Sequence, residues 1–411
     1  MSLSNKKELQ MVQRVEIIML KGRNKKEAQR LCHLSKNLYN AANYEMRQSF
    51  IAGKKKGNYQ ISTEFAKNNQ PDYRALPAQC SQQIINLLEK NWVSFFKVAK
   101  DRKNNPKKYK GKPKLPRYKK KDGYNVLIFT SQQLGNKLTK HGFLKFPKGV
   151  DLKIKTRIQQ EHIQQIRIVP EATCFKCEIV YEKEIVKNEN LKEENKISID
   201  LGVNNLATMF INDEAFSSCI INGRPLKSIN QFYNKKLAAL KSFVGDKSSN
   251  RIRNFTKRRN NKVKDFIHKA SRWIIKFCEQ HYIGHLIIGK NNGWKQESKL
   301  SKKVNQHFIG IPFEMLINQL VYKAEEIGII VKLAEESYTS KIDHLAGELF
   351  GHKEKYLGKR IHRGLFKSSI GKVINSDVNG AIGIMRKVVG DSLVTKIADS
   401  VSAFTPVIVT P

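Results

Sequence analysis

A run of apolar residues that ends on a carboxylate constrains the fold of this chain more than any other feature. Residues 196–202 read KISIDLG, a pattern in which the apolar side chains share one face of a strand and Asp200 points to the other. Gly202 follows at once and lets the backbone turn. A carboxylate in such a run costs several kcal/mol unless it is paired or bound to a cation. The strand therefore ends on an acid that needs a salt-bridge partner or a metal ion.

A second acidic residue, Asp377, begins the last predicted helix. It follows an asparagine and a serine, which are favourable helix caps, so by itself Asp377 is also consistent with a role at the helix N-terminus. The small residues at positions 380, 381 and 383 let this helix approach a sheet closely. We therefore expect the helix to carry Asp377 toward the strand end that bears Asp200.

Strand-like and helical segments alternate over the second half of the chain. Short apolar runs predict the strands, and apolar residues spaced three and four apart predict the helices. The strands are expected at residues 196–200, 206–211, 216–220, 285–288 and 329–333, and the helices at 230–281 (in two parts), 313–326 and 378–389. Strands and helices that alternate in this way form an α/β sheet.

The first half of the chain combines short strands with two long helices. Strands are predicted at residues 13–20, 126–130, 143–146, 150–155, 164–169 and 174–181, and helices at 25–50 and 77–99. The strands could together close a small β-barrel, with the helices inserted after its first strand. The expected architecture is an α+β multidomain chain: residues 1–24 and 122–190 form the barrel, 25–121 an inserted helical domain with a basic linker, and 191–411 the α/β domain.

The chain carries a large excess of positive charge. Its 76 Lys and Arg residues against 36 Asp and Glu give a formal net charge of +40 at pH 7, while 40% of its residues are hydrophobic, as in folded proteins. A polyanion must neutralise such a surplus, and phosphate backbones are the usual one. An anionic membrane is a further option, but no stretch of about 18 apolar residues exists and residues 1–11 lack the apolar core of a signal peptide. We expect a cytoplasmic protein that binds nucleic acid and no membrane.

Three basic stretches are candidates for contact with nucleic acid. Residues 100–121 contain twelve basic residues against one acidic, interleaved with prolines that keep the backbone extended and tyrosines that offer stacking faces. A solvated linker between domains is the alternative. Residues 251–259, expected at the joint of the long helical segment, and 359–363 are the other two stretches. The candidate residues are Lys110, Lys112, Lys114, Arg117, Tyr118, Arg251, Arg253, Arg258, Arg259, Lys359, Arg360 and Arg363.

The six cysteines do not predict a metal site. Only Cys174 and Cys177 have ligand-like spacing, and they lie on a predicted strand, where residues three apart face opposite sides. No second pair completes a zinc site, so we expect reduced, packed thiols.

Several of these stretches carry a family resemblance. Residues 196–208, 287–296, 335–341, 358–369 and 374–387 resemble the RuvC domain of TnpB proteins, and residues 110–118 and 127–133 resemble the N-terminal half of that family. TnpB proteins accompany certain insertion sequences, have long been described as OrfB transposases and are similar to type V CRISPR effectors. The resemblance implies a recognition lobe and a barrel-like wedge domain ahead of an RNase H-like RuvC nuclease. It also implies that a guide RNA from the transposon end directs cleavage of double-stranded target DNA, through an RNA–DNA heteroduplex, in association with transposition.

The resemblance also assigns the catalytic, metal-binding carboxylates. Asp200 matches the first RuvC aspartate and Asp377 the last, but the usual position of the middle glutamate holds Gly289. A subset of the family that also resembles the eukaryotic Fanzor proteins carries this glutamate at the end of the next strand. That position corresponds here to Glu336, with the neighbouring Glu335 as the alternative.

Three converging carboxylates would require cations. Two of them ~4 Å apart repel by about 4 kcal/mol at an effective dielectric constant near 20. Mg²⁺, or Mn²⁺ in its place, suits a site of few carboxylates, and two such ions would support hydrolysis of a phosphodiester. Two functions stay open: an RNA-guided DNA endonuclease, or an RNA-guided DNA-binding protein or repressor that has lost cleavage, which Gly289 suggests.

One further departure from the family concerns zinc. Many relatives insert four cysteines between the middle and last motifs, whereas residues 342–372 contain none and are basic instead. Their three histidines, His344, His352 and His362, could bind a metal, although contact with nucleic acid or solvent is the simpler interpretation. We therefore expect no zinc.

Overall fold

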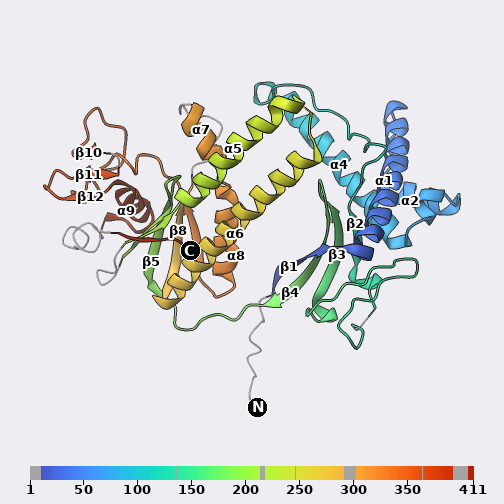
Figure 1. Cartoon of the computed structure of the whole chain (residues 1–411). Helices are drawn as coiled ribbons and strands as arrows, with labels where there is room; N and C mark the ends of the chain where they lie inside the picture. Colours follow the sequence, from blue (N-terminus) through green and yellow to red (C-terminus); the bar gives the residue numbers. More distant parts are fainter. Residues whose placement is uncertain are drawn as a thin grey trace, which may run out of the picture. The chain divides into compact units, whose positions relative to one another are not determined.

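The computed structural model describes residues 11–135, 138–212, 218–245, 247–290, 302–362, 364–391 and 406–411. The chain divides into two compact units, Met1–Glu184 and Ile185–Pro411 (Figure 1). Each unit has its own hydrophobic core, and each is described by itself.

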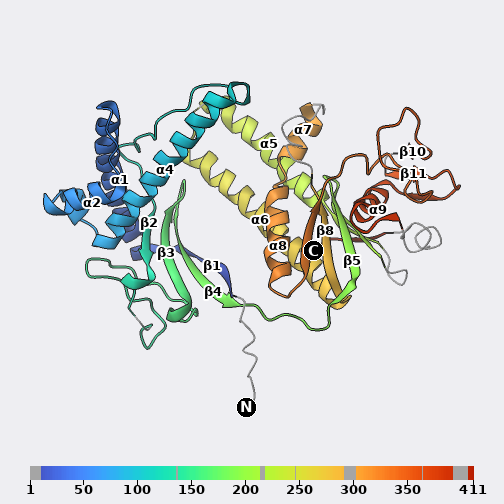
Figure 2. The ribbon, with the colours of Figure 1, turned by 180° about the vertical axis from the view of Figure 1, so that it is seen from behind.

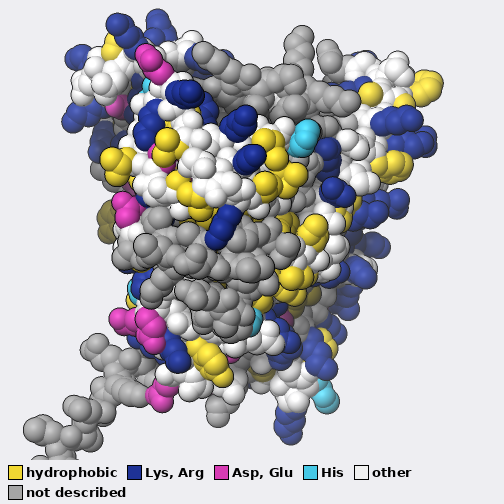
Figure 3. Space-filling view, turned by 90° about the vertical axis from the view of Figure 1, so that its left-hand side faces the viewer, with side chains coloured by type: hydrophobic (Ala, Val, Ile, Leu, Met, Phe, Trp, Pro, Cys, Tyr) yellow, Lys and Arg dark blue, Asp and Glu magenta, His cyan; other side chains and the backbone are white. Residues whose placement is uncertain are grey.

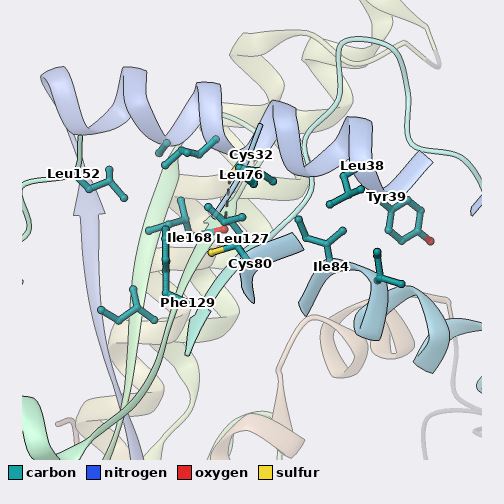
Figure 4. Close-up of a cluster of buried hydrophobic side chains, with 14 of the residues drawn as sticks. Cys32, Leu38, Tyr39, Leu76, Cys80, Ile84, Leu127, Phe129, Leu152 and Ile168 are labelled. Carbon is teal, nitrogen blue, oxygen red and sulfur yellow. Dashed lines mark hydrogen bonds between the residues drawn. The ribbon is translucent and has the colours of Figure 1, made fainter. Parts of the chain in front are cut away.

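The first unit is built on long helices that pack on a sheet. Its helices are α1 (Gly22–Ile51), α2 (Asn58–Lys67), α3 (Pro71–Arg74) and α4 (Ala78–Asn104), with short 3₁₀ turns at Pro106–Lys108, Ser131–Gln133 and Gln160–His162. The predicted helices at 25–50 and 77–99 correspond to α1 and α4, whereas α2 and α3 were not predicted. Apolar side chains of α1 and α4, among them Leu38 and Ile84, meet side chains of the sheet such as Phe129 and Ile168 (Figure 4).

The sheet of this unit is open, and the predicted closed barrel is wrong for the described residues. Strands β1 (Met11–Leu20), β2 (Leu127–Thr130), β3 (Ile163–Pro170) and β4 (Phe175–Glu184) pair antiparallel in the order β1-β4-β3-β2. The expected strands at 143–146 and 150–155 are absent, and a single bridge joins Phe143 to Lys155. Gly142 and Gly149, which directly precede these two segments, have φ angles of 78° and 87°, a left-handed conformation in which the backbone turns.

A six-stranded sheet forms the centre of the second unit. Its strands are β5 (Lys192–Leu201), β6 (Asn205–Ile211), β7 (Cys219–Asn222), β8 (Ile283–Gly289), β9 (Ile330–Ala334) and β13 (Val407–Val409), in the order β13-β7-β6-β5-β8-β9. Strand β6 pairs antiparallel with β5 and β7, while β5, β8 and β9 run parallel to one another. Of the strand predicted at 216–220, residues 216 and 217 lie outside the described residues, and the observed strand begins at Cys219.

Helices cover both faces of this sheet. They are α5 (Arg224–Val244), α6 (Asn250–Gln280), α7 (Lys302–Ile309), α8 (Phe313–Glu325) and α9 (Ser376–Val389). Side chains of α6 and α8 pack with Ile197, Ile199 and Leu201 on one face, while α9 packs on the other (Figures 1 and 2). The alternation of the β5 sequence is therefore satisfied, because its apolar face meets α6 and α8 and its polar face, with Ser198 and Asp200, meets α9.

Two further features of this unit differ from expectation. The basic stretch 251–259 lies inside α6, so the predicted joint at that position is wrong; the helices separate instead after Gly245, whose φ is 58°. A small antiparallel sheet of β10 (Lys359–His362), β11 (Leu365–Lys367) and β12 (Val373–Asn375) precedes α9 and was not predicted. No described helix has both the length and the apolar character needed to cross a membrane.

Candidate active site

Three parallel strands end side by side at one edge of the six-stranded sheet. Ile199 of β5 pairs with Ile288 of β8. Asp200 and Gly289 are the residues that directly follow this pair on the two strands. Gly289 in turn pairs with Ala334, the last residue of β9, and the Lys290 backbone N–H donates to the Ala334 carbonyl at 2.8 Å. The chain that continues beyond Ala334 therefore starts beside Gly289 and close to Asp200.

Helix α9 brings Asp377 to the same region. The Asn375 side chain caps this helix by accepting from the Asp377 N–H at 2.9 Å, and Asn205 Nδ2 at the start of β6 donates to Asp377 Oδ2 at 2.7 Å. Ser198 Oγ donates to the Ala381 carbonyl at 2.7 Å, which fixes the helix against the central strand. A Cβ atom on Gly380 would lie 2.7 Å from Asp200 Oδ2, so this close approach requires glycine, as the small residues of the helix predicted.

Glu336 occupies the space that a side chain at residue 289 would take. A Cβ atom on Gly289 would collide with Glu336 Oε1, lie 2.7 Å from Glu336 Cγ and lie 2.5 Å from Ile384 Cδ1. Glu336 is half-buried, whereas Glu335 is exposed. Of the two candidate glutamates, Glu336 is therefore the one that the fold places against the vacant position on β8 beside Asp200.

The electrostatics of the site reflect crowded acidic groups. Burial raises the pKa of Asp200 well above its usual range, and the charges of Glu336 and Asp377 raise it further, while the Leu201 N–H and Arg360 act in the opposite direction. Burial also raises the pKa of Glu336 to about 7, against the influence of the nearby Lys387. The charges of Glu336 and Asp377 thus disfavour the ionised form of Asp200, and a bound cation would favour it.

The chemistry of this set of side chains fits a divalent ion. All three are carboxylates, the hard oxygen donors that Mg²⁺ and Mn²⁺ prefer. As the described residues stand, however, no group of three acidic, histidine or cysteine side chains is close enough together to hold a metal ion.

A short hydrogen-bonded chain fixes the turn that carries Glu336. Thr339 donates to the Glu336 carbonyl through its N–H (3.2 Å) and its Oγ1 (2.9 Å), and Tyr338 between them has a φ of 64°. His344 Nε2 donates to the Thr339 carbonyl at 2.8 Å, and Arg386 Nη1 of α9 lies 2.8 Å from His344 Nδ1. Burial lowers the pKa of His344 to about 4, so the imidazole is neutral and accepts from Arg386. Because both ring nitrogens are engaged, His344 is not available as a metal ligand.

Two buried acids organise residues 342–372, and the sequence did not single them out. Asp343 accepts from Ser368 Oγ at 2.7 Å and from the Ser369 N–H at 2.7 Å. Glu348 accepts from the Asp343 N–H at 2.7 Å and from Lys353 Nζ at 3.1 Å. The available signal was the rarity of acidic residues in this basic stretch. Asn205, the partner of Asp377, was also missed, although it lies within the stretch 196–208 that carries the family resemblance.

Comparisons with known proteins agree with the family resemblance. The OrfB_IS605 family model, described as a probable transposase, matches residues 178–295, and the Cas12f1-like TNB domain model matches residues 313–384. A curated relative, TnpB-like protein ORF457 of Acidianus two-tailed virus, is 24% identical over 408 residues, which cover 90% of this chain and 85% of the viral protein. The chain is thus similar to TnpB proteins along most of its length.

Solved structures similar to this TnpB-like chain include two Cas12f proteins. One, solved as a Cas12f1–sgRNA–target DNA complex, has a TM-score of 0.49 and 16% identity, and covers 87% of this chain and 82% of that chain. The other, a CRISPR–Cas12f ternary complex, has a TM-score of 0.36 and 17% identity, and covers 87% of this chain and 80% of that chain.

The first basic stretch is fixed along α1, so a loosely solvated linker does not describe it. Asn40 exchanges hydrogen bonds with the Lys119 backbone, donating to the carbonyl at 3.0 Å and accepting from the N–H at 2.8 Å. Lys36 Nζ donates to the Lys121 carbonyl at 2.8 Å. The candidate side chains themselves remain exposed: Lys110, Lys112, Lys114, Arg117 and Tyr118. This stretch thus presents cations and an aromatic ring from a backbone held in place.

The basic residues of α6 divide into two groups. Arg251, Arg253 and Arg258 are exposed. Arg259 instead donates through Nε to Asn230 Oδ1 at 2.8 Å and through Nη2 to the Gly310 carbonyl at 2.8 Å. These internal bonds join α6 to α5 and to the end of α7, so the fold uses Arg259 for packing, in contrast to the predicted phosphate contact.

The last basic stretch lies on the small sheet before α9. Lys359 and Arg360 are exposed on β10, and the positive charge of Arg360 lowers the pKa of Asp200. Arg363 lies outside the described residues. The face that bears α9 and β10–β12 shows more Lys and Arg than Asp and Glu side chains (Figure 3). A polyanion could therefore approach this face favourably.

Adding a methyl group to residue 289 is expected to displace Glu336. Gly289→Ala should lower the free energy of unfolding by about 1–3 kcal/mol, the usual cost of overpacking, measured by chemical denaturation without divalent ions. In a Glu336→Ala background the same change should cost less, because only the contact with Ile384 Cδ1 would remain. Equal costs in both backgrounds would show that Ile384, and not Glu336, is the main obstacle to a side chain at this position.

Proposed function

We propose that this TnpB-like chain is an RNA-guided DNA endonuclease that depends on Mg²⁺, or on Mn²⁺ in its place, and acts in association with transposition. The observation that carries the proposal is the position of Glu336, whose carboxyl group fills the space of a side chain at residue 289, close to Asp200. Asp377 completes a set of three carboxylates drawn from distant parts of the sequence. The similarity to OrfB and TnpB proteins and the net charge of +40 support guide RNA and double-stranded target DNA as partners.

Asp200, Glu336 and Asp377 are the residues that would hold the divalent ions. When bound, these ions activate a water molecule and stabilise the leaving 3′-oxygen of the phosphodiester. Other groups of the protein prepare the carboxylates for this role. Asn205 fixes one oxygen of Asp377, and the charge of Lys387 favours the ionised form of Glu336, which is the form that binds a cation.

A second function is kept because the described residues contain no assembled metal-binding group. In this alternative the chain binds DNA under the direction of a guide RNA without cutting it, as a repressor would. Base pairing would supply the sequence choice, and the protein would hold the RNA–DNA heteroduplex by its backbone.

One experiment separates the two functions. The protein is purified with its co-expressed RNA and incubated with a plasmid that carries the matching target, with Mg²⁺ and with EDTA. An endonuclease cuts the matched plasmid only with Mg²⁺ and leaves a mismatched plasmid intact. Binding of the matched target without any cutting would establish the alternative, and failure to retain RNA at moderate salt would contradict both functions.

The metal-free protein is expected to lose stability as the pH rises. The pKa of Glu336 is near its ordinary value of 4.5 in the unfolded chain and about 7 in the fold, so the folded state binds the proton more tightly. Glu336 thus stabilises the fold below about pH 4.5, and this contribution is lost as the pH rises to 7, with a slope of at most about 1.4 kcal/mol per pH unit.

Calorimetry in EDTA between pH 5 and pH 8 would measure this slope, and Glu336→Gln should reduce it. Because Mg²⁺ binds the ionised carboxylates, its stabilising effect should be larger at pH 8 than at pH 5. An identical slope in wild type and variant would contradict the burial of an ionisable Glu336.

A further inference from the structure

Helices α5 and α6 form a pocket close to the turn that joins them. The pocket has a volume of about 580 Å³ and is lined chiefly by Phe232, Phe243 and Phe255 and by Lys236, Arg251 and Arg258. A volume of this size lies within the range of about 300–1,000 Å³ that is usual for small-ligand sites. The pocket therefore combines room for one ring system with apolar walls and a cationic rim.

The aromatic wall of the pocket is partly fixed and partly open to solvent. Phe255 stacks on Tyr233 with ring centroids 5.4 Å apart and planes 22° apart, and the guanidinium of Arg259 lies 5.4 Å from the centre of the Tyr233 ring. Phe232, in contrast, is 59% exposed and Phe243 is 86% exposed. Large apolar side chains left in water at such a site point to a partner that covers them.

The charges around the pocket indicate which kind of partner it would bind. Neither α5 nor residues 250–264 of α6 contain an acidic residue, so these two segments do not themselves neutralise the cationic rim. A second copy of this chain, which carries a net charge of +40, would be repelled. A nucleotide matches both properties, because its base offers a flat face for stacking and its phosphate offers negative charge.

We propose that this pocket takes one unpaired base of the bound guide RNA, stacked on Phe243 and Phe255, with the flanking phosphates on Arg251 and Arg258. The inference depends on the proposed function only in taking RNA as the resident partner. We favour RNA over target DNA because the RNA is bound before any target is. A partner that is always bound would shield the exposed phenylalanines from water at all times.

The test compares substitutions at Phe243, which is exposed enough to change without disturbing the core. Phe243→Leu keeps an apolar side chain but removes the stacking face, and should weaken binding of the co-purified RNA by about 5- to 150-fold, the equivalent of about 1–3 kcal/mol per stacked base. Phe243→Trp keeps the stacking face and should bind as wild type does. Tyr59→Ala, which removes an exposed aromatic ring from α2, is the matched control and should leave the affinity unchanged.

Salt dependence and chemical probing give independent readouts. Phe243→Leu should lower the affinity at every salt concentration without changing the salt slope, whereas Arg258→Ala should reduce the slope by about one unit. Chemical probing of the RNA should reveal one unpaired nucleotide that becomes reactive in the Phe243→Leu complex. Unchanged RNA affinity in this variant would overturn the proposal, and a defect confined to target binding would reassign the pocket to DNA. If the wild-type protein did not cleave DNA, only the proposed nuclease function would be contradicted, because binding of RNA in the pocket does not depend on cleavage.

Discussion

Replacing Glu336 by glutamine is expected to slow cleavage of a matched target by about 100-fold or more. Glutamine keeps the shape of the side chain, which fills the space beside Gly289, but it removes the negative charge that would bind a divalent ion. The loss should appear in the rate of cutting and not in target affinity, because the carboxylate acts only on the chemical step. Rates are measured at saturating protein with radiolabelled or fluorescent target DNA, together with equilibrium binding of the same target.

The neighbouring Glu335 supplies the matched control. Glu335→Gln makes the same change one residue away on an exposed side chain, and should leave the cleavage rate within about twofold of wild type. Higher Mg²⁺ or Mn²⁺ concentrations should restore part of the activity of Glu336→Gln, because two carboxylates would remain. If Glu335→Gln were the inactive variant, the relocated carboxylate would be Glu335 and the position of Glu336 would have no catalytic meaning.

Replacing Asp200 by asparagine is expected to abolish cleavage, by about 1,000-fold or more, and at the same time to stabilise the metal-free protein. Burial raises the pKa of Asp200 well above its usual range, and the charges of Glu336 and Asp377 raise it further. At pH 8 without metal, folding must either bury the charge of Asp200 or protonate the residue, and an asparagine avoids both costs. The thermal midpoint in EDTA should therefore rise, by about 2–4 °C for each kcal/mol gained in a unit of this size.

The combination of opposite effects distinguishes a catalytic carboxylate from a structural one. If Asp200 served as a salt-bridge partner, its substitution would lower the stability of the protein and would not raise it. Asp265→Asn removes the same charge from an exposed site on α6, where Asp265 pairs with Lys269 at 2.9 Å, and should change neither the cleavage rate nor the thermal midpoint appreciably. A lower thermal midpoint for Asp200→Asn in EDTA would favour a structural role for this residue.

Local sequence patterns predicted most elements of the fold because each pattern is satisfied within its own segment. The alternation of residues 196–200 required one apolar face, and the observed β5 places that face on α6 and α8. The closed barrel is not formed: residues 143–155 contain apolar residues at strand spacing, but they pair only through a single bridge between Phe143 and Lys155, beside turns at Gly142 and Gly149. Apolar spacing reports burial, and it does not report whether the backbone stays extended.

The arginines of α6 also show which properties the sequence predicts and which depend on the tertiary structure. Sequence placed Arg251 to Arg259 together as a basic stretch, yet the helical period separates Arg258, which faces solvent, from Arg259, which holds α6 to α5. Composition alone assigns a positive charge to a segment, whereas the partners of each guanidinium depend on neighbouring helices.

The sequence by itself determined that two aspartates stand at the end of a strand and at the start of a helix, because strand alternation and helix capping are local properties. Only the tertiary structure decided which glutamate joins them. Glu335 and Glu336 are equivalent in composition and adjacent in the chain, but the parallel pairing of β8 with β9 turns one carboxyl group into the space left by Gly289 and the other into solvent. That choice depends on the packing of segments distant in sequence, which no local pattern contains.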